Sequence, residues 1–250
     1  MKCLIIAAGQ GSRLRQRAES KPLVPINGVP LIERVIGAAC KGGANEFFVV
    51  SGYQGHLLRV HLDQVSIRDA IPIHHVVNDR WREPNGVSVL QAKAILDQPF
   101  LLMMSDHLFD SHIVQDLLTQ KLPGNSAILA TDSNLYNPMV DIDDVTRVYQ
   151  QDGVIREIGK GLTRYNAFDT GIFLCTPALF EALEVSMDRD GEASLSGGMR
   201  VLAETGRALS WDIGARFWLD VDDSRTYVKA EVALEHMKKD VYDVVGVLEN

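Results

Sequence analysis

This chain contains little cysteine and no long apolar run. Cys3, Cys40 and Cys175 are widely spaced among 250 residues, so neither a disulfide framework nor a Cys-x-x-Cys metal site is predicted. No stretch approaches the roughly 20 consecutive apolar residues of a membrane span. The first apolar run leads into Gly and Arg, unlike a signal peptide. We therefore expect a cytoplasmic protein in a reducing compartment, with no membrane contact through this part.

Positive charge is also scarce. The 25 Lys and Arg residues are outnumbered by 33 Asp and Glu residues, which gives a net charge of −8. Because no basic stripe offsets this acidity, nucleic acid is not expected as a partner. The chain also lacks internal repeats, a Gly-x-Ser-x-Gly motif and a cysteine with an evident base partner, so nothing supports covalent hydrolysis.

What the chain does have is alternation of short apolar strands with helices. Strands are predicted at 4–8, 46–51, 73–77 and 100–104, and helices at 30–40, 55–63 and 85–96. This order is typical of a Rossmann-like, doubly wound α/β fold with helices on both faces of the sheet. Ligands of such folds bind beyond the carboxyl ends of the strands.

The second half has a more antiparallel pattern, so we expect a mostly parallel but mixed sheet. The predicted elements are helix 111–120, strand 126–131, a hairpin over 145–158 with Asp152-Gly153 at its turn, a strand ending at 169–174, helices 177–186 and 197–205, strand 208–213 and helix 224–238. One domain over 1–240 is expected. Residues 241–248 resemble a strand, and 241–250 are either a tail or the start of a further domain.

The first candidate site is the loop after the first strand. Gly9 and Gly11 would let backbone N–H groups approach an anion, and a following helix would add the positive end of its dipole. Arg13 and Lys21 could then neutralise a polyphosphate. The stretch is neither GxxxxGK[ST] nor GxGxxG, so an ordinary strand–loop–helix connection with solvated cations is the alternative.

A metal site is predicted from carboxylates. Asp106 follows the apolar strand 100–104, and a carboxylate at such a strand end is well placed to hold Mg²⁺; capping the next turn is the alternative. Asp220 and Asp222 lie on one face of an extended chain. We favour Asp220 as the second ligand and keep Asp222 in reserve, because Asp222 or Asp223 could cap the helix that follows.

Two further residues could contact substrate. Lys160 lies between two glycines, where a flexible backbone would let the cation reach a phosphate; a solvated lysine is the alternative. His107 could touch substrate or transfer a proton, or be a hydrogen-bonded structural histidine.

Taken together, these segments resemble the sugar-phosphate nucleotidylyltransferase family. LIIAAGQGSRL followed by Lys21-Pro22-Leu23 matches that family's LAAGxGxRL and KP pattern, and Ser105-Asp106 stands where the family has its metal-binding Gly-Asp. Asn85-Gly86 with Ser88, Asp106-His107, Ile158-Gly159-Lys160, DTGIF and WLDVDDSR are closer to the CTP:inositol-1-phosphate cytidylyltransferases. Some members of that branch are fused to a membrane-embedded phosphotransferase, which would lie beyond residue 250.

The resemblance implies a role for each matched residue. Residues 1–110 would bind the nucleotide, and 111–240 the acceptor. The catalytic group would be Arg13, Lys21 and Asp106. The nucleotide would contact Ala7, Ala8, Gly9, Gly11, Ser12, Arg13, Lys21, Asn85, Gly86 and Ser88, the acceptor would contact His107, Lys160, Asp169 and Gly171, and Mg²⁺ would bind Asp106 and Asp220.

The implied reaction is transfer of a nucleotidyl group, CMP from CTP, to a phosphorylated alcohol such as inositol-1-phosphate, with release of pyrophosphate. Phosphocholine, a phosphonate or a sugar-1-phosphate is an alternative acceptor. More distant alternatives are a catalytically dead nucleotide-sugar-binding module and a glycosyltransferase. A glycosyltransferase would call for an Asp-x-Asp after a strand in the first half, which Asp106-His107-Leu108 does not supply; Asp220-Val221-Asp222 has the pattern only superficially and late in the chain. The sequence does not indicate an oligomeric state.

Overall fold

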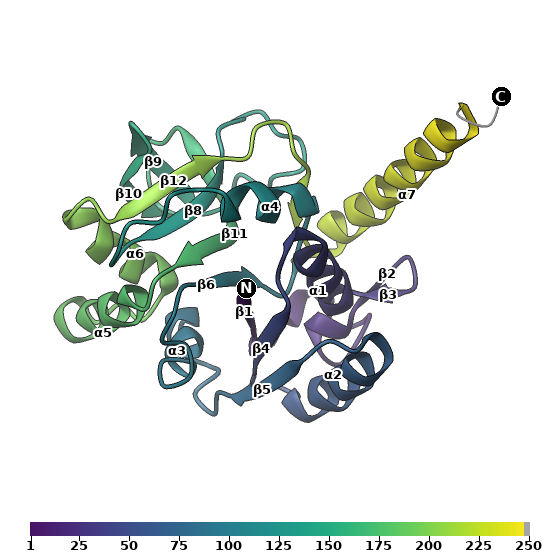
Figure 1. The fold of residues 1–250 in the computed structure, drawn as a ribbon, viewed down its shortest axis with the longest axis horizontal. Helices are drawn as coiled ribbons and strands as arrows, with labels where there is room; N and C mark the ends of the chain where they lie inside the picture. The colour runs from purple at the N-terminus through teal and green to yellow at the C-terminus, as the bar shows by residue number, and fades with distance from the viewer. Residues whose placement is uncertain (248–250) are drawn as a thin grey trace.

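A nine-stranded sheet forms the centre of the molecule (Figure 1). The computed structural model describes residues 1–247, with side chains described through residue 236. The strands lie in the order β5 (Ile73–Val77), β4 (Glu46–Ser51), β1 (Lys2–Ala7), β6 (Phe100–Met104), β11 (Ala167–Cys175), β8 (Ala127–Asp132), β12 (Ala208–Asp212), β10 (Val154–Gly159) and β9 (Arg147–Gln151). Only β10 and β11 run against the common direction. The predicted mostly parallel, mixed sheet is confirmed.

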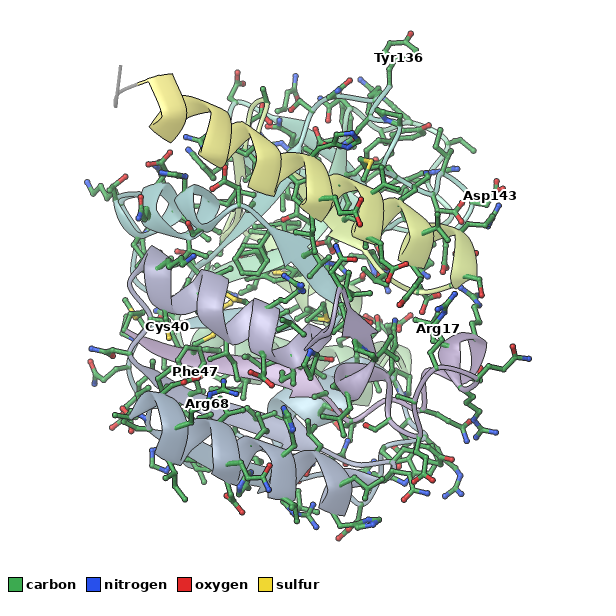
Figure 2. The ribbon with its side chains drawn as sticks, turned by 90° about the vertical axis from the view of Figure 1, so that its right-hand side faces the viewer. Arg17, Cys40, Phe47, Arg68, Tyr136 and Asp143 are labelled. Atoms are coloured by element: carbon green, nitrogen blue, oxygen red, sulfur yellow. The ribbon has the colours of Figure 1, made fainter. Side chains whose placement is uncertain are left out.

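Helices cover both faces of this sheet. One face carries α1 (Leu31–Gly42), α2 (Gly55–Asp69) and α4 (Ser111–Leu118), whose apolar residues form one core cluster with the sheet (Figure 2). The other face carries α3 (Asn85–Leu90), α5 (Ala178–Asp190) and α6 (Leu195–Glu204). None of the helices in the described residues is both long and apolar enough to cross a membrane.

The local sequence explains where these elements begin and end. In α1 the buried residues Leu31, Ile32, Val35 and Ile36 recur at helical spacing. Gly43 ends the helix with a left-handed φ of 112°. Asp152 and Gly153 both have positive φ, 54° and 74°, as the tight turn of the predicted hairpin requires.

Strands β1 and β6 are parallel neighbours, with Ile6 paired to Met104. Their carboxyl ends therefore lie side by side. This brings the loop that contains Gly9 and Gly11, which we call the glycine loop, to the same edge of the sheet as Asp106. Two short strands that the sequence pattern did not predict, β7 (His107–Phe109) and β13 (Trp218–Asp220), pair at this same edge. A second small pair, β2 (Pro25–Ile26) and β3 (Val29–Pro30), was also missed.

Three predicted elements differ from the structure. The glycine loop leads into a single 3-10 turn, Ser12–Leu14. The prediction that a helix follows this loop and adds the positive end of its dipole is therefore wrong. Helix α3 ends at Leu90, well before residue 96. Residues 241–247 continue α7 (Ser224–Val247), which projects from the body (Figure 1), and residue 248 lies outside the described residues. The predicted strand there is wrong because no Gly or Pro interrupts residues 224–245, and helix propagation outweighs the weak β preference of Val and Tyr.

Candidate active site

Lys21 is fixed in place by the glycine loop. Gly11 has a left-handed φ of +56°, and a Cβ built there would lie 2.3 Å from the Lys21 Cβ. The missing side chain therefore lets the lysine stem pack directly on the loop backbone, and Lys21 is only 9% exposed. The second glycine, Gly9, has open space around it.

Carboxylates surround the Lys21 ammonium. Its Nζ donates to Asp106 Oδ2 at 2.5 Å and to Asp222 Oδ1 at 2.7 Å. Burial alone would lower the pKa of Lys21, but Asp106, Asp220 and Asp222 more than offset it, and the pKa is raised. The lysine is a permanent cation at the carboxyl edge of the sheet.

The pairing of β7 with β13 aligns Asp106, His107 and Asp220 at this edge. Its register places Asp220 opposite His107, and Val221 N donates to the Asp106 carbonyl at 3.0 Å. His107 Nδ1 donates to the Thr170 carbonyl at 2.7 Å, which leaves Nε2 facing Asp220 Oδ2 at 3.5 Å. Burial disfavours the charged imidazole, yet Asp220 and then Asp106 raise the pKa of His107 to about 9.

These side chains fit a divalent cation. Asp106 and Asp220 each offer a carboxylate oxygen beside a ring nitrogen of His107, and all three atoms lie within 4.8 Å of one another. Asp220 Oδ1 is buried and has no hydrogen-bond partner among the described residues, which is costly for a carboxylate oxygen unless a ligand meets it. Carboxylate oxygens are the donors that hard divalent ions prefer.

Strand β11 brings two more predicted residues beside His107. Gly171 has φ +74°, and a Cβ there would lie 2.3 Å from His107 Nδ1, so only glycine leaves room for the imidazole. Asp169 Oδ1 accepts from Gly171 N at 2.7 Å. Burial raises the pKa of Asp169 to about 6.

Arg13 and Lys160 reach the site from opposite halves of the chain and share a carboxylate. Arg13 pairs with Asp222 and, at 2.8 Å, with Asp144 Oδ2. Lys160 pairs with Asp144 Oδ1. Together these groups line a cavity of about 160 Å³, whose wall also includes Asn85, His107, Asp169, Gly171 and Asp220. Arg13 and Lys160, two of the three predicted phosphate-binding cations, therefore line one cavity.

The predicted nucleotide contacts around α3 are mostly buried. Asn85 lines the cavity, and its Oδ1 accepts from Leu195 N at 2.8 Å. Gly86 lies against the loop before α6, where a Cβ would be 2.5 Å from the Ala193 carbonyl. Ser88 is buried and accepts from Asn78 at 2.9 Å. Ala7 and Ala8 are buried and Ser12 is exposed; nucleotide contact by these residues stays a prediction.

Comparison with known proteins identifies the family of this chain. Residues 3–203 match the MobA-like NTP transferase domain. The chain belongs to this family. It is 31% identical over 228 residues to the bifunctional IPC transferase and DIPP synthase of Rubrobacter xylanophilus, covering 87% of this chain and 48% of that protein. The homologue of the same name from Archaeoglobus fulgidus is 29% identical, with 94% of this chain and 44% of the relative covered.

Other known proteins are matched along most of their own length. UTP–glucose-1-phosphate uridylyltransferase AglF of Haloferax volcanii is 25% identical, with 92% of this chain and 98% of the relative covered. The structure of the inositol-1-phosphate CTP transferase from T. maritima superposes with a TM-score of 0.77 at 21% identity over 90% of each chain. The predicted family and fold are confirmed. The chain spans about half the length of the bifunctional relatives.

Two features of the site were missed or left open by the sequence. Asp144 was not predicted, although the acidic run Asp141-Ile142-Asp143-Asp144 in a segment between two strands was a usable signal. Asp223, and not Asp222, caps α7, because its Oδ1 accepts from the backbone N of both Arg225 and Thr226 at 2.8 Å. Asp222 is thereby left to bind Arg13 and Lys21.

The packing of Lys21 on Gly11 gives a prediction about stability. Gly11→Ala forces a left-handed φ on alanine and a collision with the Lys21 stem, so we expect a loss of at least about 1 kcal/mol in the free energy of unfolding. The matched control is Gly9→Ala, where Cβ meets nothing within 4 Å and φ is not left-handed. Thermal unfolding of both variants measures this, and equal midpoints would contradict the proposed packing.

Proposed function

We propose that this domain transfers CMP from CTP to the phosphate of inositol-1-phosphate and releases pyrophosphate. The observation that carries the proposal is that Lys21 meets the candidate metal ligand Asp106 at one sheet edge. Asp220 lies beside Asp106 there, and Asp222 joins Lys21 to Arg13. The bifunctional relatives are named for IPC transferase activity, which supports CTP and inositol-1-phosphate as the substrate pair.

In this reaction an oxygen of the acceptor phosphate attacks the α-phosphorus of the nucleotide in line. A new P–O bond forms as the bond to the β-phosphate oxygen breaks, and the electron pair leaves with pyrophosphate. The second pKa of a phosphate monoester is about 6, so the attacking group is already ionised near neutral pH and needs no general base. The protein's contribution is positioning and neutralisation of charge.

The glycine loop would hold the triphosphate. Arg13, exposed and reaching into the cavity, is suited to the leaving pyrophosphate. Lys21 is buried and rigid, and its ammonium would stabilise the charge that develops on the α-phosphate. Asp106 and Asp220 would hold Mg²⁺, which when bound supplies further positive charge to the phosphate oxygens. Residues 1–110 would thus handle the nucleotide.

The second half would hold the acceptor. Lys160 lines the cavity and is suited to the acceptor phosphate. Asp169 and His107 also line the cavity, where their polar atoms would be hydrogen-bond partners for hydroxyl groups of a polyol. Nucleoside triphosphates are available in the cytoplasm, and the three cysteines are free. We therefore place this activity in the cytoplasm.

One other substrate pair has specific support. AglF is covered over 98% of its length by the match, so UTP with glucose-1-phosphate is the second candidate. Both pairs use the same chemistry and the same cations, and they differ in the base and in the shape of the acceptor. The predicted site residues would serve either pair.

A substrate panel separates the two. The protein is incubated with Mg²⁺, each of the four NTPs, and inositol-1-phosphate, glucose-1-phosphate or phosphocholine, and pyrophosphate is measured. We expect the highest rate with CTP and inositol-1-phosphate. A higher rate with UTP and glucose-1-phosphate would overturn the substrate assignment, and no pyrophosphate from any pair would overturn the proposed reaction.

A further inference from the structure

Asp144 connects the two substrate halves of the cavity. Its Oδ2 lies 2.8 Å from Arg13 NH1 in the glycine loop, and its Oδ1 pairs with Lys160 in the turn after β10. These two cations come from opposite halves of the chain. Asp144 is not among the residues predicted to contact either the nucleotide or the acceptor. Hydrogen bonds from Lys160 and then Arg13 lower the pKa of Asp144 to about 2, so the carboxylate is charged throughout the physiological range.

The segment that carries Asp144 is anchored beside the cavity. Asp132, at the end of β8, accepts from Asn137 Nδ2 at 2.8 Å. Asp141 pairs with Arg225 of α7 at 2.9 Å, and Lys229 donates to the Pro138 carbonyl at 2.6 Å. These contacts hold residues 137–141 against the body, and the turn that follows is bonded to them, with Asp144 N donating to the Asp141 carbonyl at 3.2 Å.

The Asp144 carboxylate occupies the position that phosphate oxygens would take on both cations. If Arg13 binds the nucleotide and Lys160 the acceptor, as the proposed function requires, each substrate brings negative charge to a place already held by this anion. We propose that Asp144 is a shared counter-ion that couples the two binding steps: the first phosphate to bind displaces it, and the second substrate then binds more tightly. This inference rests on the proposed function.

The strength of these ion pairs sets the size of the coupling. Arg13 and Lys160 are 58% and 62% exposed and Asp144 is 33% exposed, so each pair is of the weak, solvent-screened kind. A multiply charged phosphate can therefore displace Asp144. The two weak pairs together correspond to a coupling factor of about 3- to 30-fold. By linkage, nucleotide and acceptor must strengthen each other's binding by the same factor.

The test compares Asp144→Asn with Asp143→Asn. Asp143 carries the same charge one residue away, is exposed, and points outward from the body (Figure 2). Calorimetry with Mg²⁺ gives the Kd of inositol-1-phosphate, with and without saturating α,β-methylene-CTP, for the wild type and both variants. Thermal unfolding confirms that each variant is folded.

We expect the nucleotide analogue to tighten inositol-1-phosphate binding by about 3- to 30-fold in the wild type and in Asp143→Asn. Asp144→Asn should bind inositol-1-phosphate more tightly without nucleotide and lose most of the coupling. Wild-type coupling retained in Asp144→Asn, in a protein that turns over substrate, would overturn this inference and leave the proposed function intact. Failure of the wild type to bind either ligand would overturn both.

Discussion

Lys21→Met is expected to lower kcat by at least about 100-fold. Removal of one preorganised donor to the charge that develops in the transition state, here on the α-phosphate, typically has an effect of this size. Methionine keeps the apolar stem that packs on Gly11 and removes the ammonium. Because that ammonium donates to Asp106 at 2.5 Å, it lies beside the carboxylate that we assign to the metal, where the α-phosphate would react. KM for the nucleotide should change less than kcat. Steady-state pyrophosphate release measures both constants.

The matched control for Lys21→Met is Arg15→Met. Arg15 is an exposed cation close to the same loop, and its side chain contacts Tyr53, with NH2 and Oη 3.3 Å apart. This variant removes the same charge from the N-terminal region and leaves the carboxylate cluster untouched, so we expect wild-type turnover. Near-wild-type kcat in Lys21→Met, or an equal loss in Arg15→Met, would rule out the assigned role of Lys21.

Asp220→Asn is expected to weaken divalent-cation binding by at least about tenfold and to lower turnover by about 100-fold or more. Asparagine keeps the shape of the side chain and removes the charge. Asp220 Oδ1 is buried without a hydrogen-bond partner among the described residues, so the structure offers this oxygen to a ligand. Binding of Mn²⁺, followed by its electron paramagnetic resonance signal, measures the affinity without requiring catalysis.

Asp222→Asn is the matched comparison, because both Asp222 oxygens already meet cations, Lys21 at 2.7 Å and Arg13. We expect this change to leave Mn²⁺ affinity within about threefold, since hydrogen-bonded ion pairs and not the metal occupy this carboxylate. The reverse pattern, with Mn²⁺ binding lost in Asp222→Asn and kept in Asp220→Asn, would transfer the ligand role to Asp222.

Much of the fold was predictable because its strands are short, buried and apolar. The predicted bounds of 46–51, 73–77 and 100–104 coincide with β4, β5 and β6. Ligands of such folds bind beyond the carboxyl ends of the strands, and this rule predicted that the glycine loop and Asp106 lie together. They do so because β1 and β6 are parallel neighbours. For this part, strand pattern and one topological rule were sufficient.

The precise geometry of the site was not predictable, because it depends on contacts between distant segments. Strands β7 and β13 have three residues each, too few to show an alternating pattern, yet their pairing sets Asp220 opposite His107. Arg13 and Asp144 are 131 residues apart in sequence. The acidic run over residues 141–144 marks a candidate anion, but no local pattern indicates which distant cation it will bind.

The most direct test of the central claim is the fate of the nucleotide phosphates. The protein is incubated with Mg²⁺, CTP and inositol-1-phosphate, and the mixture is followed by ³¹P NMR. Transfer at the α-phosphorus predicts resonances of pyrophosphate and of a new diphosphate diester, growing together in equal amounts. Unchanged CTP, or inorganic phosphate and CDP in place of pyrophosphate, would contradict nucleotidyl transfer at this site.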